Sequence, residues 1–365
     1  MEAILPWGPL QHRLHRRLLK DPQLLPRGRR LLLAVSGGQD SMALTTLLLE
    51  LQRLHDWDLH LWHGNHGWRK EAADQAGELT AWAASLGLPM RVENAATGPA
   101  SRDISTEEAG RRWRYERLNR QALSLGCTRV VTGHTGSDRA ETLLFNLARG
   151  CGLRGLSSLR ASRPLSGSIA LVRPLLGFSR AETASYCEQQ QLPLWLDPGN
   201  DDPRFSRNRL RQEVMPVLEE LHPGAWRRLG ALAERLEGTQ ELTEELARLA
   251  LVALQTPAGP LTAGEPPQQG PGLQRQWLSE LSARSQELLL DLWLERSAGV
   301  RLGARSLESL RRRLPLSQGP GSLTLPGGSR LVWDRQSVRL QPEPNEPADP
   351  SGPPEPGAVS SPSNR

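Results

Sequence analysis

Short apolar runs alternate with amphipathic stretches along residues 29–207, and this alternation predicts a parallel sheet covered by helices on both faces. The predicted strands are the apolar runs 31–35, 59–63, 89–93, 129–132 and 169–172. Apolar residues at helical spacing lie between them, over 42–54, 71–86, 106–123, 139–148 and 180–191. We therefore expect a doubly wound, Rossmann-like α/β domain over residues 29–207.

The flanking residues follow other patterns. Residues 1–28 are expected to hold a short basic amphipathic helix, and residues 208–255 a helical extension rich in Leu, Arg and Glu. A Pro- and Gly-rich linker is expected over 256–274. The last 25 residues, 341–365, are rich in proline and are expected to form a disordered tail.

Residues 275–340 indicate a small second domain of α+β type. Helical patterns over 278–295 and 306–313 are followed by two alternating segments, 322–325 and 330–333. Gly327-Gly328 lies between these segments, which is a signal for a β-hairpin.

Composition narrows the class of protein. With 365 residues, 38% of them hydrophobic and 23% charged, most of the chain is expected to be globular. No apolar run approaches the roughly 18 residues of a membrane span, and no signal-peptide pattern precedes the first domain, so we expect a cytoplasmic protein without a membrane partner. The three cysteines are far apart, which argues against disulfides, structural zinc and iron–sulfur chemistry.

The net charge of +5 favours a polyanionic partner, but all basic residues except Lys20 and Lys70 are arginines, as compositional bias alone would produce. The position of the charge is more informative. Six arginines and no carboxylate occur from Arg149 to Arg180. This stretch is either a solvated basic surface or a face that binds nucleic acid.

The strongest chemical signal is a turn, Ser36-Gly-Gly-Gln-Asp-Ser41, between the first predicted strand and its helix. Gly37 and Gly38 allow successive backbone N–H groups to point into one concavity, and the helix adds its positive N-terminal end. Such a turn suits phosphate, while Asp40 is best explained as a ligand to a Mg²⁺ ion that bridges the phosphate. The alternative is a capped helix after a glycine turn. No Gly-Lys-Ser/Thr follows, so this is not a Walker loop.

Two further polar segments follow strand ends. His63-Gly-Asn-His-Gly-Trp-Arg69 comes after the second predicted strand and Thr132-Gly-His-Thr-Gly-Ser-Asp-Arg-Ala-Glu-Thr142 after the fourth. Because the carboxyl ends of parallel strands meet at one edge of the sheet, we expect these segments to converge on the Ser36–Ser41 turn. A lone histidine such as His66 is more often structural, and this convergence favours a functional role.

The Ser36–Ser41 turn resembles the pyrophosphate loop of the N-type ATP pyrophosphatases, the PP-loop superfamily, which split ATP into AMP and pyrophosphate while adenylating a substrate. Within that superfamily the chain is similar to the tRNA(Ile)-lysidine synthetase family over residues 29–220. The motifs that carry the similarity are this turn, 66–69, 107–115, 133–142 and 197–211. Residues 275–340 are weakly similar to the small appended tRNA-binding region of that family.

The resemblance implies a reaction. Free L-lysine would be ligated to C2 of the wobble cytidine (position 34) in an isoleucine tRNA with a CAU anticodon, through an adenylated tRNA, with release of AMP and pyrophosphate. ATP and Mg²⁺ are the implied cofactors, and this tRNA and L-lysine are the implied partners. The sequence leaves a homodimer open.

The resemblance also implies roles for individual residues. ATP binding is implied for Ser36, Gly37, Gly38, Gln39, Asp40, Ser41 and His66, with Asp40 as the Mg²⁺ ligand. Catalytic roles are implied for Asp40, His134, Asp138 and Glu141, and lysine binding for Asp138, Glu141, Arg207 and Arg211. Binding of tRNA is implied for Arg111, Arg114, Arg149, Arg154 and Arg173.

Several of these roles have structural alternatives. Asp138 and Glu141 would share one helix face and hold an ammonium group, or cap the helix and complement its dipole. Arg207 and Arg211 bind the lysine carboxylate or phosphates, or face the following helix. His134 fits both nucleotide contact and proton transfer.

Three other functions compete with this interpretation. A PP-loop tRNA thiolase would need a persulfide-forming cysteine or a cluster-binding Cys-x-x-Cys pair, and neither spacing occurs. A non-catalytic tRNA-binding module would use the arginines alone. A small-molecule amide ligase such as an NAD synthetase would not explain the basic stretch from Arg149 to Arg180.

Overall fold

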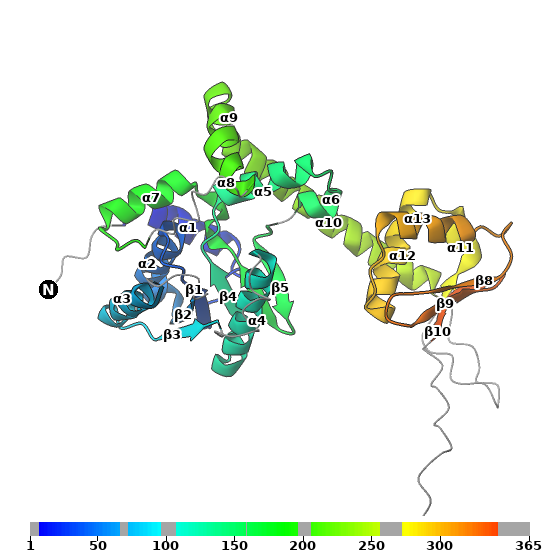
Figure 1. Cartoon of the computed structure of the whole chain (residues 1–365), viewed down its shortest axis with the longest axis horizontal. Helices are drawn as coiled ribbons and strands as arrows, with labels where there is room; N and C mark the ends of the chain where they lie inside the picture. Colours follow the sequence, from blue (N-terminus) through cyan, green and yellow to red (C-terminus); the bar gives the residue numbers. More distant parts are fainter. Residues whose placement is uncertain are drawn as a thin grey trace, which may run out of the picture. The chain divides into compact units, whose positions relative to one another are not determined.

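The structure, a computed structural model, describes residues 7–65, 72–95, 107–157, 159–195, 206–255 and 272–341. The chain divides into two compact units, Met1–Gln240 (unit 1) and Glu241–Arg365 (unit 2), whose elements are labelled in Figure 1. The division falls within helix α10 (Ala225–Leu254). The segments predicted as linker and tail lie almost entirely outside the described residues.

Unit 1 contains a six-stranded sheet with the strand order β3-β2-β1-β4-β6-β5. Its strands are β1 (Arg30–Ala34), β2 (Asp58–Asn65), β3 (Met90–Asn94), β4 (Arg129–Thr132), β5 (Ser162–Ser166) and β6 (Ile169–Val172). All neighbouring strands are parallel except the β5–β6 pair, which is antiparallel. The five strands predicted from apolar runs are all present, and the predicted α/β fold class is confirmed.

The edge strand β5 was not predicted, because its residues Ser162–Ser166 are mostly polar and include Pro164. It pairs with β6 through a tight turn at Gly167, whose φ of +48° lies in the left-handed region. An edge strand tolerates a proline, because one side of its backbone needs no partner in the ladder.

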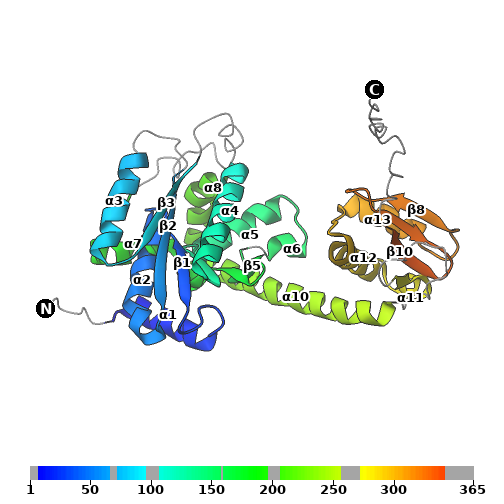
Figure 2. The same cartoon turned by 90° about the horizontal axis from the view of Figure 1, so that it is seen from below.

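Helices cover both faces of this sheet (Figure 2). The helices of unit 1 up to the division are α1 (Pro9–Lys20), α2 (Gln39–His55), α3 (Ala72–Ser85), α4 (Glu107–Leu125), α5 (Gly136–Ala148), α6 (Leu153–Leu156), α7 (Arg180–Gln189), α8 (Ser206–Arg209) and α9 (Met215–Leu221). Successive β1 residues point to opposite faces: Leu31 and Leu33 pack in the core with α1, α2 and α7, and Leu32 packs in the core with α4. This alternation explains why β1 is apolar throughout.

The strand order creates a switch point at the carboxyl ends of β1 and β4. The chain proceeds from β1 to its neighbour β2 on one side, and β4 pairs with β1 on the other. The loops that leave these two strands therefore diverge, which opens the edge of the sheet between them. The Ser36–Ser41 turn follows β1 and the Thr132–Thr142 segment follows β4, so both lie at this opening.

Unit 2 has a four-stranded antiparallel sheet in the order β7-β10-β9-β8, packed with helices around its own apolar core. Its elements are β7 (Leu273–Gln274), α11 (Arg275–Glu280), α12 (Ala283–Ala298), α13 (Ala304–Arg313), β8 (Gly321–Thr324), β9 (Arg330–Trp333) and β10 (Ser337–Gln341). The predicted hairpin through Gly327-Gly328 joins β8 and β9. The single helix expected over 278–295 is wrong, since Ser282 caps a new helix by accepting a hydrogen bond from the Ser285 N–H.

Among the described residues, no helix combines the length and the apolar character that a membrane crossing requires.

Candidate functional site

The loop after β1 is closed by its own hydrogen bonds. The Ser36 N–H donates to Ser41 Oγ (3.1 Å), and that hydroxyl donates to the Gly38 carbonyl (2.8 Å). Gly37 has a φ of +84°, and a Cβ there would lie only 3.2 Å from the ring of Trp195. The Trp195 N–H also donates to the Gly37 carbonyl (3.0 Å). The loop therefore requires glycine at position 37, and Trp195 buttresses it.

The end of β4 touches the start of α2. A Cβ on Gly133 would lie 2.8 Å from the Asp40 carbonyl group and 2.9 Å from the Ser41 nitrogen, so only glycine permits this approach. Two of the three segments that were expected to converge are thus in contact. The third includes His66 and Arg69, which lie outside the described residues.

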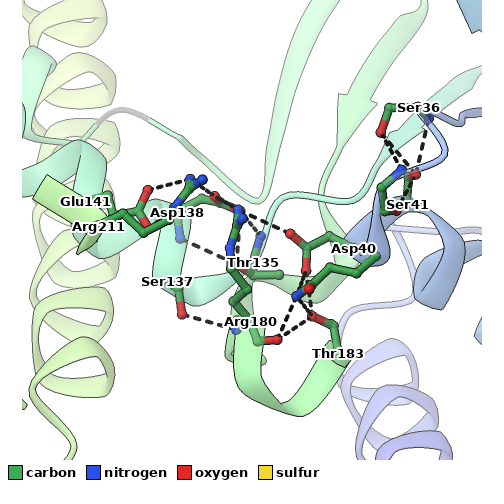
Figure 3. A network of polar contacts seen from close by, with 12 residues as sticks. Ser36, Asp40, Ser41, Thr135, Ser137, Asp138, Glu141, Arg180, Thr183 and Arg211 are labelled. Carbon is green, nitrogen blue, oxygen red and sulfur yellow. Dashed lines mark hydrogen bonds and ion pairs between the residues drawn. The ribbon is translucent and has the colours of Figure 1, made fainter. Parts of the chain in front are cut away.

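One guanidinium group connects these two segments. Arg180 Nη2 lies 3.2 Å from Asp40 Oδ2 and 2.8 Å from Asp138 Oδ1 (Figure 3). Asp40 Oδ1 accepts a hydrogen bond from Thr183 Oγ1 (2.5 Å). The side-chain amide of Gln39 also contacts α7, where it donates to the Arg180 carbonyl (2.9 Å). The first turn of α7 thus holds Asp40 at the end of the loop.

A second guanidinium group lies on the other side of Asp138. Arg211 forms a two-pronged contact with Glu141, through Nε (3.0 Å) and Nη2 (2.8 Å), and its Nη2 is 3.5 Å from Asp138 Oδ1. The remaining oxygen of Asp138 accepts from the N–H (2.7 Å) and the hydroxyl (2.9 Å) of Thr135, which completes the capping box of α5. Asp138 therefore serves as a helix-capping residue and as an ion-pair partner.

Arg211 comes from an irregular stretch of helix. The chain from Ser206 to Leu221 is helical, but Leu210–Val214 forms a π-helical turn between α8 and α9. A π-helical turn inserts an extra residue and rotates the side chains that follow it, and such turns are frequent at functional sites. This turn presents Arg211 to Glu141 on α5.

Burial and charge set the protonation states of the two aspartates differently. Burial raises the pKa of Asp40 to about 6. The positive charge of Arg180 opposes this rise, and the negative charge of Asp138 adds to it. Burial also acts on Asp138, but Arg180 and the Thr135 hydrogen bonds oppose it, and the pKa of that carboxyl group is lowered. Asp138 is therefore ionised at neutral pH, whereas the ionisation of Asp40 depends on the nearby charge of Arg180.

His134 is neutral at physiological pH. Burial lowers its pKa to about 4, and the surrounding guanidinium groups of Arg173, Arg111 and Arg114 act in the same direction against Asp138. Its Nδ1 lies 3.0 Å from Thr132 Oγ1. The ring is therefore an uncharged hydrogen-bonding group at the end of β4.

A cavity of about 340 Å³ opens beside Glu141. Its charged lining consists of Glu141, Arg180, Arg211 and Glu219, and its apolar lining includes Met215 and Trp226. A cavity lined by both charged and apolar side chains suits a small molecule that carries charged groups on an aliphatic chain.

The remaining predicted residues lie around this centre. Arg207 does not join the ion pairs of Asp138 and Glu141 described above, and its guanidinium stacks over Phe145 (5.7 Å), as that of Arg149 does (5.3 Å). Arg154 lies on α6. Arg111, Arg114 and Arg173 lie close enough to His134 for their charges to lower its pKa.

Sequence reasoning missed Arg180, Thr183 and Trp195. The Ser179-x-x-Glu182 capping box is readable in the sequence and predicts where α7 begins. Nothing in the local pattern indicates that the next residue, Arg180, reaches two carboxylates from two other segments. Trp195 precedes the matched 197–211 motif by two residues, and its contact with Gly37 is a property of the fold alone.

Comparison with known proteins assigns the chain to a family. The family model of the PP-loop domain matches residues 10–218. The tRNA(Ile)-lysidine synthase of Parasynechococcus marenigrum is 48% identical over 342 residues, which are 93% of this chain and 96% of that protein. The tRNA(Ile)-lysidine synthase of Synechococcus sp. is 41% identical over 92% of this chain and 97% of that protein.

A solved structure shares the fold at greater distance. The U34-tRNA thiolase NcsA from Methanococcus maripaludis superposes with a TM-score of 0.52 and 20% identity, over 62% of this chain and 79% of that one. The two proteins thus share a fold over that part of the chain. The identity to the lysidine synthases is higher and extends over nearly the whole chain. The chain belongs to the tRNA(Ile)-lysidine synthase family of PP-loop proteins.

Proposed function

We propose that the chain ligates free L-lysine to C2 of cytidine 34 in an isoleucine tRNA with a CAU anticodon, using ATP. The C2 carbonyl of cytosine is a poor electrophile, so its oxygen is first adenylated and pyrophosphate departs. The lysine ε-ammonium loses a proton to solvent, the resulting amine attacks C2, and AMP leaves with the former carbonyl oxygen. Each step balances, because one ATP yields AMP and pyrophosphate for one C–N bond formed.

The observation that carries this proposal is the double contact of Arg180. A nucleotide held by the Ser36–Ser41 loop has Asp40 at its edge, and an amino acid held at α5 has Asp138 and Glu141. Because one guanidinium group touches both Asp40 and Asp138, the two sites are adjacent. Adjacent sites are what a reaction between an activated nucleotide and an amine requires.

Asp40 fits a role as Mg²⁺ ligand. Mg²⁺ commonly takes one or two carboxylates from the protein and its other ligands from substrate phosphates and water, and Asp40 is a buried carboxyl group at the phosphate loop. The ion supplies neutralisation of charge on the departing pyrophosphate. The N–H groups of the loop and the N-terminal end of α2 act on the same phosphates.

The cavity beside Glu141 is the proposed lysine site. Glu141 in the cavity wall, with Asp138 behind it, holds the α-ammonium group, and Arg211 holds the α-carboxylate. At present Arg211 occupies both oxygens of Glu141, so lysine binding is an exchange of partners in which the guanidinium turns to the ligand. The aliphatic chain lies along Met215 and Trp226. Glu219 also lines the cavity, but both of its oxygens already accept hydrogen bonds, from the N–H groups of Gly224 (2.8 Å) and Trp226 (2.7 Å).

His134 contacts the nucleotide in this proposal and does not deprotonate lysine. The pKa of a lysine ammonium is about 10.4, and that of His134 is lowered to about 4. A base so weak does not take a proton from that ammonium group. A neutral imidazole is a suitable hydrogen-bonding partner for a base or a ribose.

The proposal is tested with purified protein, ATP, Mg²⁺, labelled lysine and bulk tRNA. Acid-insoluble label is expected only in tRNA with a CAU anticodon, and label elsewhere or none at all would overturn the proposal. For the lysine site, Asp138→Asn is expected to raise the KM for lysine at least tenfold, since it removes a charge-assisted contact. Glu213→Gln, an exposed acid paired with Arg209, serves as the matched control. An unchanged lysine KM in Asp138→Asn would contradict the assignment.

The cysteines do not favour a thiolase. Burial raises the pKa of the Cys127 and Cys187 thiols to about 11 each, which disfavours the thiolate that sulfur transfer needs. A variant with all three cysteines replaced by alanine is expected to retain lysine incorporation. Loss of incorporation with an intact fold would instead favour sulfur chemistry.

A further inference from the structure

Three guanidinium groups from three elements surround the ring of Tyr115 on α4. The Arg163 guanidinium, from β5, lies 4.9 Å from the ring centroid, and that of Arg111, one turn earlier on α4, lies 5.6 Å from it. Arg173, which directly follows β6, acts on the Tyr115 hydroxyl as well. We call these four residues the Tyr115 cluster.

The cluster carries positive charge that no described acid neutralises. In the described part of the chain, Arg111, Arg163 and Arg173 form no ion pair with a carboxylate. Arg173 is 1% exposed, and its Nε has no hydrogen-bond partner, although one of its terminal nitrogens donates to the Arg160 carbonyl (2.7 Å). A buried cation without a counter-charge is costly, and a bound anion removes that cost.

The other two deeply buried arginines differ from Arg173 in how their charge is compensated, although the Nε of Arg139 also lacks a hydrogen-bond partner. Arg139, which is 3% exposed, pairs with Glu237 on α10. Arg275 donates to several backbone carbonyls, among them those of Leu314 and Gln318. Arg173 differs from both, because its surroundings add further guanidinium groups. The contrast indicates that its charge is kept for a ligand.

The titration behaviour of the cluster agrees with this. Burial raises the pKa of the Tyr115 hydroxyl, but Arg111, Arg173 and Arg163 outweigh it and lower that pKa from its ordinary value. Burial lowers the pKa of Arg173 to about 10, assisted by the like charges of Arg163 and Arg111. Both shifts are those of a site with excess positive charge.

The cluster lies beside the reaction site. β6 pairs with β4, so Arg173 at the end of β6 neighbours the residues that follow β4. Arg173 and Arg111 also both lower the pKa of His134. The phosphates of ATP already have the loop after β1 and the N-terminal end of α2. An anion at the cluster is therefore a separate group that enters the same edge of the sheet.

We propose that the Tyr115 cluster is a phosphodiester subsite that grips the tRNA backbone next to the nucleotide being modified. This inference rests on the proposed function, since it takes the polyanion to be the substrate RNA. Guanidinium forks match the two free oxygens of a phosphodiester, and the cluster gathers three of them from α4, β5 and the end of β6. A backbone held there positions the wobble base while carrying no sequence information.

The test uses the full chain and a CAU-anticodon isoleucine tRNA, with affinity measured by fluorescence anisotropy over a salt series. Arg111→Gln and Arg163→Gln change residues that are not fully buried, so both variants are expected to fold. Each is expected to weaken binding about tenfold near 0.1 M salt and to reduce the slope of log Kd against log salt by about 0.7 to 0.9. Arg112→Gln, the exposed neighbour of Arg111 that lies 4.0 Å from Glu108, is the matched control and is expected to change binding less than twofold.

Two further arms identify the anion. A neutral methylphosphonate linkage beside cytidine 34 is expected to weaken wild-type binding by a similar factor and to have no further effect in Arg163→Gln. An unchanged tRNA Kd in Arg111→Gln and Arg163→Gln overturns the inference. A raised KM for ATP with unchanged tRNA binding shows that the cluster binds nucleotide phosphate instead.

Lysine incorporation at saturating tRNA is measured in parallel. Its absence in the wild-type protein refutes the proposed function, whereas its presence with normal variant affinities refutes only the phosphodiester subsite.

Discussion

Replacement of Arg180 by glutamine is the perturbation that most directly tests the arrangement of the site. Arg180→Gln removes the positive charge that Asp40 and Asp138 share at 3.2 and 2.8 Å. Breaking a buried ion pair by removing one partner costs about 3–5 kcal/mol. Because the Arg180 side chain is 32% exposed, water screens part of this charge, and we expect a loss of about 2 kcal/mol of unfolding free energy at pH 8.

The loss is expected to depend on pH, with a sign that follows from Asp40. The pKa of Asp40 is raised from 3.8 to about 6 in the folded protein, so the folded state binds this proton more tightly than the unfolded state. Its contribution to stability is therefore most favourable below pH 4 and declines as the pH rises to about 6. Without Arg180 the Asp40 pKa rises further, which extends the decline toward neutral pH. Urea unfolding is thus expected to show a larger loss at pH 8 than at pH 5.

Activity is expected to report the same shift. If Asp40 must be ionised to hold Mg²⁺, the acid limb of the kcat/KM profile for AMP formation lies near pH 6 in the wild-type protein and about one unit higher in Arg180→Gln. Arg180→Lys keeps the charge and is expected to restore most of the difference. Arg209→Gln breaks an exposed pair with Glu213 and is expected to leave both profiles unchanged. Superimposable acid limbs in wild type and Arg180→Gln would refute the claim that Arg180 controls the charge of Asp40.

Three other variants test separate parts of the structure. Gly37→Ala would place a Cβ 3.2 Å from the Trp195 ring at a residue whose φ is +84°. We therefore expect at least a tenfold loss of Mg-ATP affinity by calorimetry, with an unchanged circular dichroism spectrum. An affinity within twofold of wild type would contradict the loop assignment. His134→Gln keeps a neutral hydrogen-bonding group, so most of kcat and the shape of the pH profile are expected to persist, whereas loss of a kinetic pKa would identify His134 as a proton carrier. Arg275→Met leaves the carbonyls of Leu314, Pro315 and Gln318 without their donor, and a loss of about 3 kcal/mol in chemical denaturation of the full chain is expected; wild-type stability would show that water replaces the guanidinium.

The elements that sequence reasoning located are those whose pattern is local. An apolar run such as Leu31–Leu33 is a buried strand in almost any α/β context, and a glycine turn that leads into a helix predicts a phosphate loop from backbone geometry alone. Both signals are carried by consecutive residues. The edge strand Ser162–Ser166 was missed for the opposite reason, since its pairing depends on β6 being available and not on its own polar residues.

The same distinction applies to the site. The three-residue spacing of Asp138 and Glu141 on one helix is visible in the sequence, and the structure places both on α5 as expected. Their partners come from positions 42 and 70 residues further along, Arg180 at the start of α7 and Arg211 in a π-helical turn. A chain with 43 arginines gives no local reason to choose these two.

The arginines that matter are distinguished by burial and by what they face, and this separates two uses of the same side chain. Arg180 and Arg211 face carboxylates, so they hold the acidic groups in place. In the proposed function, lysine exchanges partners with them through its own ammonium and carboxylate groups. Arg173 faces other cations and a tyrosine, so its charge is balanced only when an anion arrives. Under the two proposals above, Arg180 and Arg211 organise the amino acid side of the reaction, and Arg173 prepares the edge of the sheet for a phosphate. A site that joins a zwitterion to a polyanion needs both kinds of arginine, and the fold supplies them from the ends of neighbouring elements, α7 and β6.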